Sequence, residues 1–170
     1  MLIPDSIEKL KLVLSQLILT MILNLPQYSF RLKEQSGKRY IFDGFRRRWV
    51  VLTPEEWVRQ NFARYLTEVK QYPASLVAIE RSLKINQRDF RTDIVLFSQK
   101  GNPLVVVECK APEVKISQQV FDQIALYNLD LRVSYLIVTN GMAHYCCKFD
   151  QQQLTYTFLP EIPDYQVIKE

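Results

Sequence analysis

The feature that most constrains the fold is an uninterrupted apolar run, Leu104-Val105-Val106-Val107, that ends in the charged triplet Glu108-Cys109-Lys110. Consecutive β-branched residues without polar alternation are typical of a strand that is buried on both faces. Because side chains alternate along a strand, we expect Glu108 and Lys110 to point one way and Cys109 the other, toward packing. Charged residues that begin abruptly at the end of such a strand indicate a site at the edge of the sheet.

A second acidic residue, Asp93, interrupts the preceding apolar segment Thr92-Asp93-Ile94-Val95-Leu96-Phe97. The link between the two segments, residues 98–103, is short, polar and contains Gly and Pro, which favours antiparallel neighbours. Asp93 would then reach Glu108 and Lys110. The sequence therefore predicts that two carboxylates and an ammonium converge at one edge of a sheet.

These three side chains together suggest a specific chemistry. Asp93 and Glu108 would provide carboxylate ligands for a hard divalent cation such as Mg²⁺, and the backbone carbonyl of Cys109 could supply a further oxygen ligand. A metal held there can polarise a phosphodiester and lower the pKa of a bound water. Lys110 would orient that water or stabilise the pentacovalent phosphorus, and low exposure would shift its pKa downward. The alternative is a structural ion pair, because Glu-x-Lys is common in half-exposed strands.

These residues resemble the PD-(D/E)xK nuclease superfamily, with Asp93 at the first acidic position and Glu108-Cys109-Lys110 as the (D/E)-x-K element. Thr92 replaces the proline that names the first motif. Downstream, Gln123-Ile124-Ala125-Leu126-Tyr127 resembles the Gln-x-x-x-Tyr helix motif of RecB-like nucleases. Residues i and i+4 share one helix face, so Gln123 and Tyr127 could both face the metal site or a bound phosphate.

A closer resemblance is to the nuclease-like domain at the N-terminus of type I restriction enzyme motor subunits, and to stand-alone proteins that carry it. It is most specific in residues 40–43, 52–60, 91–95 and 107–112. The resemblance implies an α/β fold of the α+β type, a restriction-endonuclease-like core with a central mixed β-sheet flanked by helices. It also implies a DNA endonuclease that depends on Mg²⁺, with Mn²⁺ able to substitute, and Asp93, Glu108 and Lys110 in the catalytic positions. The chain has no room for a helicase motor, so translocation-coupled cleavage is not expected.

Thr53-Pro54-Glu55-Glu56 is the start of a clear helix. Thr53 is a good N-cap, Pro54 fits the first helical position and Glu56 completes a capping box. The resemblance gives Glu56 a second role, because many relatives have a metal-facing acidic residue on the helix before the core sheet. Capping alone is the favoured interpretation. The apolar stripe of this helix comprises Trp57, Val58, Phe62, Tyr65, Leu66 and Val69.

Two basic series are candidates for DNA contact, since a net charge of +4 leaves no indiscriminate basic tail. Arg46, Arg47 and Arg48 either alternate around a strand as solvated side chains or contact phosphates. The second series, Arg81, Lys84, Arg88 and Arg91, could flank the same cleft. Arg91 shares the strand face of Asp93, where it would contact the scissile phosphate or pair with Glu108 or Asp93.

The 170 residues are enough for one compact domain, which we place at 26–170 after an N-terminal helical extension at 1–25. The extension resembles a signal peptide superficially, but it lacks a small-residue cleavage site and polar residues interrupt it. We therefore expect a buried or partner-facing helix and no membrane anchor. Three cysteines without a Cys-x-x-Cys pair indicate a reducing, cytoplasmic setting. The single histidine, His144, argues against a histidine-built zinc centre or a Ser-His-Asp hydrolase.

The remaining pattern predicts the order of elements. Strand-like segments occupy 28–51 with turns at 35–38 and 43–44, and further strands are predicted at 76–85, 133–139 and 143–149, with a helix at 117–129 and a hairpin turn at Asn140-Gly141.

The leading hypothesis is a Mg²⁺-dependent deoxyribonuclease of restriction or repair. The alternative is a non-catalytic or partner-dependent DNA-binding or assembly module that retains the nuclease fold. A purely structural domain is the third hypothesis, and it requires the Gln-x-x-x-Tyr match to be accidental. The expected partners are DNA, a second copy of the chain, since cutting both strands commonly needs two active sites, and separately encoded restriction or repair subunits.

Overall fold

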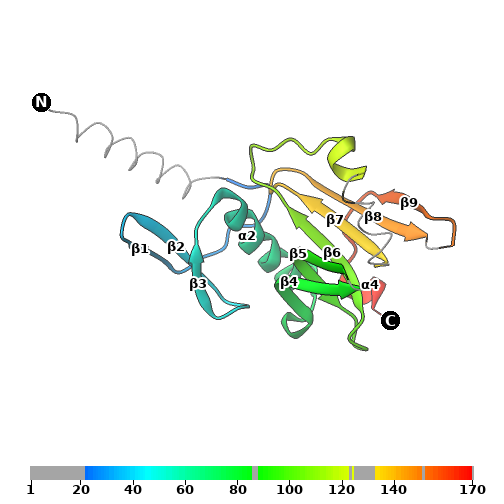
Figure 1. Cartoon of the computed structure of the whole chain (residues 1–170), viewed down its shortest axis with the longest axis horizontal. Helices are drawn as coiled ribbons and strands as arrows, with labels where there is room; N and C mark the ends of the chain where they lie inside the picture. The colour runs from blue at the N-terminus through cyan, green and yellow to red at the C-terminus, as the bar shows by residue number, and fades with distance from the viewer. Residues whose placement is uncertain (1–21, 86–87, 123, 125–132, 151, 170) are drawn as a thin grey trace, which may run out of the picture.

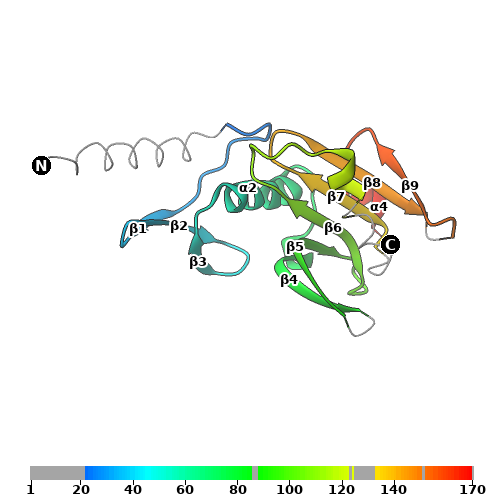
Figure 2. The same cartoon turned by 45° about the horizontal axis from the view of Figure 1, so that its top comes forward.

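The structure is a computed structural model that describes residues 22–85, 88–122, 124, 133–150 and 152–169. It contains two β-sheets (Figure 1). The smaller sheet is antiparallel and has the order β1-β2-β3, formed by β1 (Leu32–Gln35), β2 (Lys38–Asp43) and β3 (Arg48–Val51). Helix α2 (Pro54–Glu68) follows directly. It lies between the two sheets in both views (Figures 1 and 2).

The larger sheet has six strands in chain order, β4-β5-β6-β7-β8-β9. The strands are β4 (Val77–Ile85), β5 (Arg88–Phe97), β6 (Pro103–Cys109), β7 (Tyr135–Thr139), β8 (His144–Asp150) and β9 (Thr155–Leu159). Neighbouring strands are antiparallel except β6 and β7, which are parallel. A parallel pair needs a long crossover, here residues 110–134. A short 3₁₀ turn, η1 (Ala74–Leu76), precedes β4, and α4 (Tyr165–Ile168) follows β9.

Both faces of the large sheet are covered. Helix α2 buries Val58, Phe62 and Leu66 completely, and these belong to one core cluster with Val105 and Val107 of β6. Their spacing of four residues places them on one helix face. On the opposite face, Val106 packs in a second cluster with Phe121, whose segment 118–122 is helical. The unbroken apolar run of β6 therefore forms a strand buried on both sides, as its sequence predicted.

The predicted α+β class with a central mixed sheet is confirmed, as are the strands and turns expected between residues 32 and 51 and the hairpin between β7 and β8. Of the helix predicted at 117–129, residues 118–122 and 124 are helical and the others lie outside the described residues. Strand β9 and helix α4 were not predicted.

The N-terminal extension is described only at its end, because residues 1–21 lie outside the described part of the chain. Residues 22–25 are irregular and dock onto the β7–β8 loop, where the Asn24 amide donates to the Gly141 carbonyl at 2.8 Å. Leu23 is buried in the same core cluster as Val58. Within the residues that the structure describes, no helix has the length and apolarity that a bilayer crossing requires.

The three cysteines are buried free thiols. The His144 ring, at the start of β8, lies 2.7 Å from the Thr139 hydroxyl and 3.0 Å from the Asn24 carbonyl. Burial lowers the pKa of His144. These contacts tie the start of β8 to the end of β7 and to residue 24.

Candidate active site

The site forms where the β5–β6 ladder ends. Ile94 pairs with Val107, so the next residues outward, Asp93 and Glu108, lie opposite each other on neighbouring strands. Beyond the last backbone pair, the Asp93 side chain replaces a backbone carbonyl as the hydrogen-bond partner of β6: its Oδ2 accepts from the Cys109 amide at 2.7 Å. The predicted meeting of Asp93 and Glu108 at one sheet edge is what the structure shows.

Lys110 lies beside Glu108, with its Nζ donating to Glu108 Oε1 at 2.8 Å. Cys109, between them, is buried in the core, so the predicted alternation of these three side chains is present. Burial raises the pKa of Glu108, and the nearby charge of Asp93 raises it further. Burial alone would lower the pKa of Lys110, but the bond to Glu108 raises it above its ordinary value. The expected downward shift of Lys110 is therefore wrong, because its partner carboxylate outweighs desolvation.

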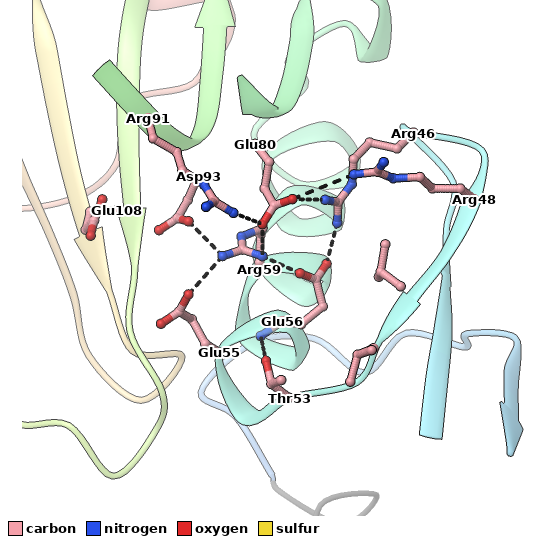
Figure 3. Close-up of a pocket in the computed structure, with 12 residues that line it drawn as sticks. Arg46, Arg48, Thr53, Glu55, Glu56, Arg59, Glu80, Arg91, Asp93 and Glu108 are labelled. Carbon is pink, nitrogen blue, oxygen red and sulfur yellow. Dashed lines mark hydrogen bonds and ion pairs between the residues drawn. The ribbon is translucent and has the colours of Figure 1, made fainter. Parts of the chain in front are cut away.

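Arg59 of α2 occupies the centre of the acidic cluster (Figure 3). Its Nη2 donates to Asp93 Oδ1 at 2.7 Å and to Glu55 Oε1 at 2.9 Å. Its Nη1 donates to Glu56 and, at 3.3 Å, to Glu80. Burial alone would lower the pKa of Arg59, but Asp93 and Glu56 raise it. The protein thus places its own permanent cation among these carboxylates.

Glu56 does more than cap its helix. The Thr53 hydroxyl accepts from the Glu56 amide at 3.0 Å, so the N-cap formed as predicted. The Glu56 carboxylate, however, accepts from Arg59, from Gln60 and, at 2.8 Å, from Arg46. Burial raises the pKa of Glu56. The interpretation of Glu56 as a capping residue alone is therefore wrong: its amide is capped, and its carboxylate lines the pocket.

The three consecutive arginines do not alternate around a strand. Arg46 and Arg47 belong to the turn before β3, with Arg47 at a φ of 53°, and Arg48 is the first residue of the strand. The Arg46 side chain is nearly buried and bonds to Asp43, Glu56 and Glu80. Arg48 remains exposed on the pocket rim, 3.8 Å from Glu80. The alternative of solvated strand residues is wrong for Arg46, because three carboxyl oxygens, one each from Asp43, Glu56 and Glu80, hold its side chain.

Glu80 is an unusual member of the cluster. It has a left-handed φ of 47° within β4, between the paired residues Ile79 and Arg81. Its carboxylate binds Arg46 and Arg59, and it accepts from Arg91 at 3.1 Å. Burial would raise the pKa of Glu80, but these arginines hold it below its ordinary value. A non-glycine residue in this conformation is strained, and such strain persists where surrounding contacts determine it.

Together these side chains enclose a pocket of about 530 Å³. Its lining comprises Arg46, Arg48, Val50, Val51, Thr53, Glu55, Glu56, Arg59, Glu80, Arg91, Asp93 and Glu108 (Figure 3).

The other predicted site residues are placed as follows. Arg91 pairs with Glu80 rather than with Asp93 or Glu108, and its side chain is 78% exposed. Lys84 and Arg88 lie on β4 and β5, with backbone positions alone described. Gln123 and Tyr127 lie outside the described residues.

Three residues of the site were missed from the sequence: Glu55, Arg59 and Glu80. The spacing of Glu55 and Arg59 by four residues is a detectable signal for a helical ion pair. Glu80 carries no such signal, because its direction depends on a backbone conformation that the sequence pattern does not indicate.

The arrangement has the donor types of a hard-cation site. Asp93 and Glu108 are adjacent carboxylates, and each carboxylate offers about four lone-pair positions, so the bonds already made to Asp93 leave acceptor capacity. Among the described residues, no group of three or more histidine, cysteine, aspartate or glutamate side chains is arranged to hold a metal ion. A divalent cation here would therefore take its remaining ligands from backbone oxygen and water.

The chain resembles a known protein family and has similar solved structures. The sequence pattern of a family described as the type I restriction enzyme R protein N terminus matches residues 54–163. No curated protein is significantly similar to the chain. A solved fragment of a protein assigned as an HsdR subunit of a type I restriction enzyme from Vibrio vulnificus YJ016 has a TM-score of 0.43 and 17% sequence identity, covering 65% of this chain and 24% of that one. The chain thus spans about a quarter of that solved chain.

Proposed function

Since the chain belongs to the family of the type I restriction enzyme R protein N terminus, we propose that it is a Mg²⁺-dependent DNA endonuclease that hydrolyses phosphodiester bonds. The observation that carries the proposal is the meeting of Asp93 and Glu108 on neighbouring strands, with the Lys110 ammonium 2.8 Å from Glu108. This is the charge arrangement that metal-assisted phosphodiester hydrolysis requires.

Asp93 and Glu108, with the Cys109 carbonyl, are the residues that would hold the cation. Bound there, Mg²⁺ supplies Lewis-acid activation of the phosphoryl group and of a water nucleophile. Arg59 holds the Asp93 carboxylate in place through the bond to Oδ1. Glu55 shares the Nη2 group of Arg59 with Asp93, and Glu56 binds Nη1, so both act on the site through Arg59.

Lys110 serves as a fixed positive charge. The bond to Glu108 raises the pKa of Lys110, which favours the protonated ammonium. In the proposed mechanism it stabilises negative charge that develops on the phosphoryl oxygens. In this proposal the exposed arginines on the pocket rim, Arg48 and Arg91, contact the DNA backbone, since guanidinium groups bind phosphate in a bidentate manner.

The test is a cleavage assay. The purified full chain is incubated with linear, circular and single-stranded DNA in Mg²⁺ or Mn²⁺, with EDTA as one control and Lys110→Ala as the other. Lys100→Ala, in the exposed β5–β6 turn, is the matched lysine variant. We expect cleavage that EDTA and Lys110→Ala abolish and Lys100→Ala retains. Cleavage that persists in Lys110→Ala would contradict the assignment of Lys110 to the active site.

A second function is favoured by one observation, the Arg59 network. Four carboxylates around Arg59 are neutralised by the protein's own side chains, an arrangement that is complete without metal. This suits a DNA-binding or assembly module that acts with separately encoded restriction or repair subunits, or as a homodimer. DNA binding in EDTA without cleavage in either metal would support this function over the first.

A further inference from the structure

The three-stranded sheet has one face that borders the proposed site at Val51 and is otherwise not part of it. Its charged and aromatic residues share it by strand register, because Lys33 pairs with Tyr40, Phe42 pairs with Trp49, and the Phe42 amide donates to the Arg31 carbonyl. Gln35 and Val51 lie on the same face, since they pair with Lys38 and Tyr40. We call this the outer face and define it by Arg31, Lys33, Lys38, Tyr40, Phe42 and Trp49. The opposite face carries Ile41 and Asp43, both fully buried.

The outer face interleaves cations with aromatic rings. The Arg31 guanidinium carbon lies 3.6 Å from the centre of the Phe42 ring. Lys33 Nζ lies 4.9 Å from the Trp49 ring and 5.3 Å from the Tyr40 ring. The Phe42 and Trp49 rings meet edge to face at 5.4 Å. Arg31, Lys38 and Trp49 are exposed, so both the charges and a ring surface are accessible to a ligand.

The charge on this face has a single sign. The nearest acidic residues of these strands, Glu34 and Asp43, alternate to the other face. Asp43 is in addition bound to Arg46. A surface that offers cations and aromatic rings together, without carboxylates among them, is complementary to a polyanion that also presents flat apolar groups.

We infer that the outer face binds single-stranded nucleic acid. Unpaired bases can stack on Trp49 and on the guanidinium of Arg31, while Lys33 and Lys38 neutralise the phosphates. A duplex would offer the phosphates alone, because its bases are already stacked on one another. The inference extends the proposed function by naming a strand form of the substrate, but binding at this face needs no hydrolysis.

The position of the face supports this use. Val51, which follows Trp49 by two residues on β3 and pairs with Tyr40, lines the pocket. Arg48 and Val50 line it from the opposite face of the same strand, so the pocket lies along the β3 edge of this sheet. A single strand that lies across the outer face toward β3 would therefore reach, at Val51, the pocket that Asp93 and Glu108 line.

The test is fluorescence anisotropy of a labelled deoxythymidine oligomer titrated with the full chain in EDTA, so that no cleavage intervenes. Trp49→Ala should weaken binding by about tenfold or more, since stacking contributes about 1–3 kcal/mol per base. Trp49→Phe should restore most of the affinity. Tyr145→Ala removes an aromatic ring of comparable exposure from β8 and should leave binding unchanged.

Salt dependence separates stacking from charge. Lys33→Gln should lower the slope of log affinity against log salt by about 0.7, the value for one phosphate of a single strand. Trp49→Ala should leave that slope unchanged. Lys148→Gln is the matched control, because Lys148 lies over the Tyr135 ring at 6.0 Å on the large sheet. Thermal unfolding of each variant shows whether a loss of binding reflects loss of the fold.

Equal affinity of the folded Trp49→Ala and Lys33→Gln variants with the parent would overturn the inference, as would tighter binding of a duplex of the same length. A ribouridine oligomer shows which nucleic acid is preferred, and binding of either one supports the inference. Oligomer binding in EDTA without cleavage in Mg²⁺ would retain the inference and remove the proposed catalysis. If the folded Trp49→Ala and Lys33→Gln variants bind the oligomer and cleave DNA as the parent does, the proposed catalysis stands and the inference about the outer face fails.

Discussion

The Asp93 carboxylate lies 2.7 Å from the Cys109 amide nitrogen and accepts its hydrogen bond at the point where the β5–β6 ladder ends. Its other oxygen accepts from Arg59, also at 2.7 Å. Asp93 is thus both a candidate metal ligand and a structural acceptor that joins two strands and a helix. Glu108, its proposed co-ligand, bonds to the half-exposed Lys110. The two carboxylates should therefore respond differently to substitution.

Substitution of Asp93 should separate stability from chemistry. Asp93→Ala leaves the Cys109 amide and the buried Arg59 without this partner, and should cost about 2–4 kcal/mol in the free energy of unfolding. Asp93→Asn keeps an oxygen acceptor and should cost less. Glu108→Ala breaks a partly exposed pair and should cost less than about 1 kcal/mol. Urea unfolding measures the three values; equal losses for Asp93→Ala and Glu108→Ala would contradict the structural role of Asp93.

Arg59 should be the most costly charge to remove from α2. Arg59→Met leaves Glu56 and Asp93 without their shared cation, which should cost about 3–5 kcal/mol, the range for breaking a buried ion pair. Arg64→Met is the matched control, because Arg64 pairs with Glu68 on the exposed side of the same helix. Its cost should stay within about 1 kcal/mol. Similar denaturation midpoints for the two variants would show that the Arg59 network contributes little to stability.

The raised pKa of Glu108 predicts a pH dependence of stability. The folded chain holds this proton more tightly than the unfolded chain, so ionisation of Glu108 opposes folding. In EDTA, the parent should lose stability relative to Glu108→Gln as the pH rises through the window that begins near the ordinary value of 4.5 and ends at the raised pKa. Urea unfolding at a series of pH values checks this. A gain of the parent over Glu108→Gln across the same window would refute the direction of the shift.

Addition of a divalent metal should reverse the loss of stability that ionised Glu108 causes relative to Glu108→Gln. A cation bound by Asp93 and Glu108 stabilises the ionised carboxylates, so Mn²⁺ at about one hundred times its dissociation constant should add about 2.7 kcal/mol to the free energy of unfolding. The increase should disappear with EDTA and in Glu108→Gln. Thermal denaturation at neutral pH with and without Mn²⁺ gives the readout, and a shift that Glu108→Gln retains would place the ion elsewhere.

Gly141 should report on the docking of residues 22–25. It has a φ of 80°, and a Cβ there would lie 2.7 Å from Leu23 Cδ2. Gly141→Ala should therefore strain the left-handed backbone and clash with Leu23, and the two effects together should lower the free energy of unfolding by about 2–4 kcal/mol.

Gly37→Ala provides the comparison, because Gly37 has a φ of 68° and open space around its Cα. Its cost should be about 1–2 kcal/mol, from the left-handed backbone alone. In the Leu23→Ala background, Gly141→Ala should fall toward the Gly37→Ala value. Equal costs of the two glycine variants in the parent would mean that Leu23 can move away freely.

The elements that were predictable are those whose residues carry their own signal. The β6 strand followed from its apolar run, and α2 followed from Thr53, Pro54 and the spacing of Val58, Phe62 and Leu66. The convergence of Asp93 and Glu108 followed from the short link between their strands. Strand β9 (Thr155–Leu159) was missed although threonine and aromatic residues alternate in it; it is short and largely exposed at the sheet edge.

The arginine network was not predictable for a different reason. Arg46 meets Glu80 across 34 positions of sequence, and it does so because Arg46 lies in a turn and Glu80 has a left-handed backbone. Neither property follows from residue type. A triple-arginine stretch is commonly solvated, so the sequence favoured a surface role for a side chain that the fold encloses.

The position of Arg46 also determines where this domain can be joined to another protein in a chimera. The family match begins at residue 54, yet Arg46, which is bound to Asp43, precedes it and binds Glu56 and Glu80 within the matched segment. A chimera that starts at Pro54 would import the acid cluster and leave behind one of its cations. A segment that keeps this cation in its cluster therefore has to include the turn between β2 and β3, and a junction at Pro54 would leave Glu56 and Glu80 without Arg46.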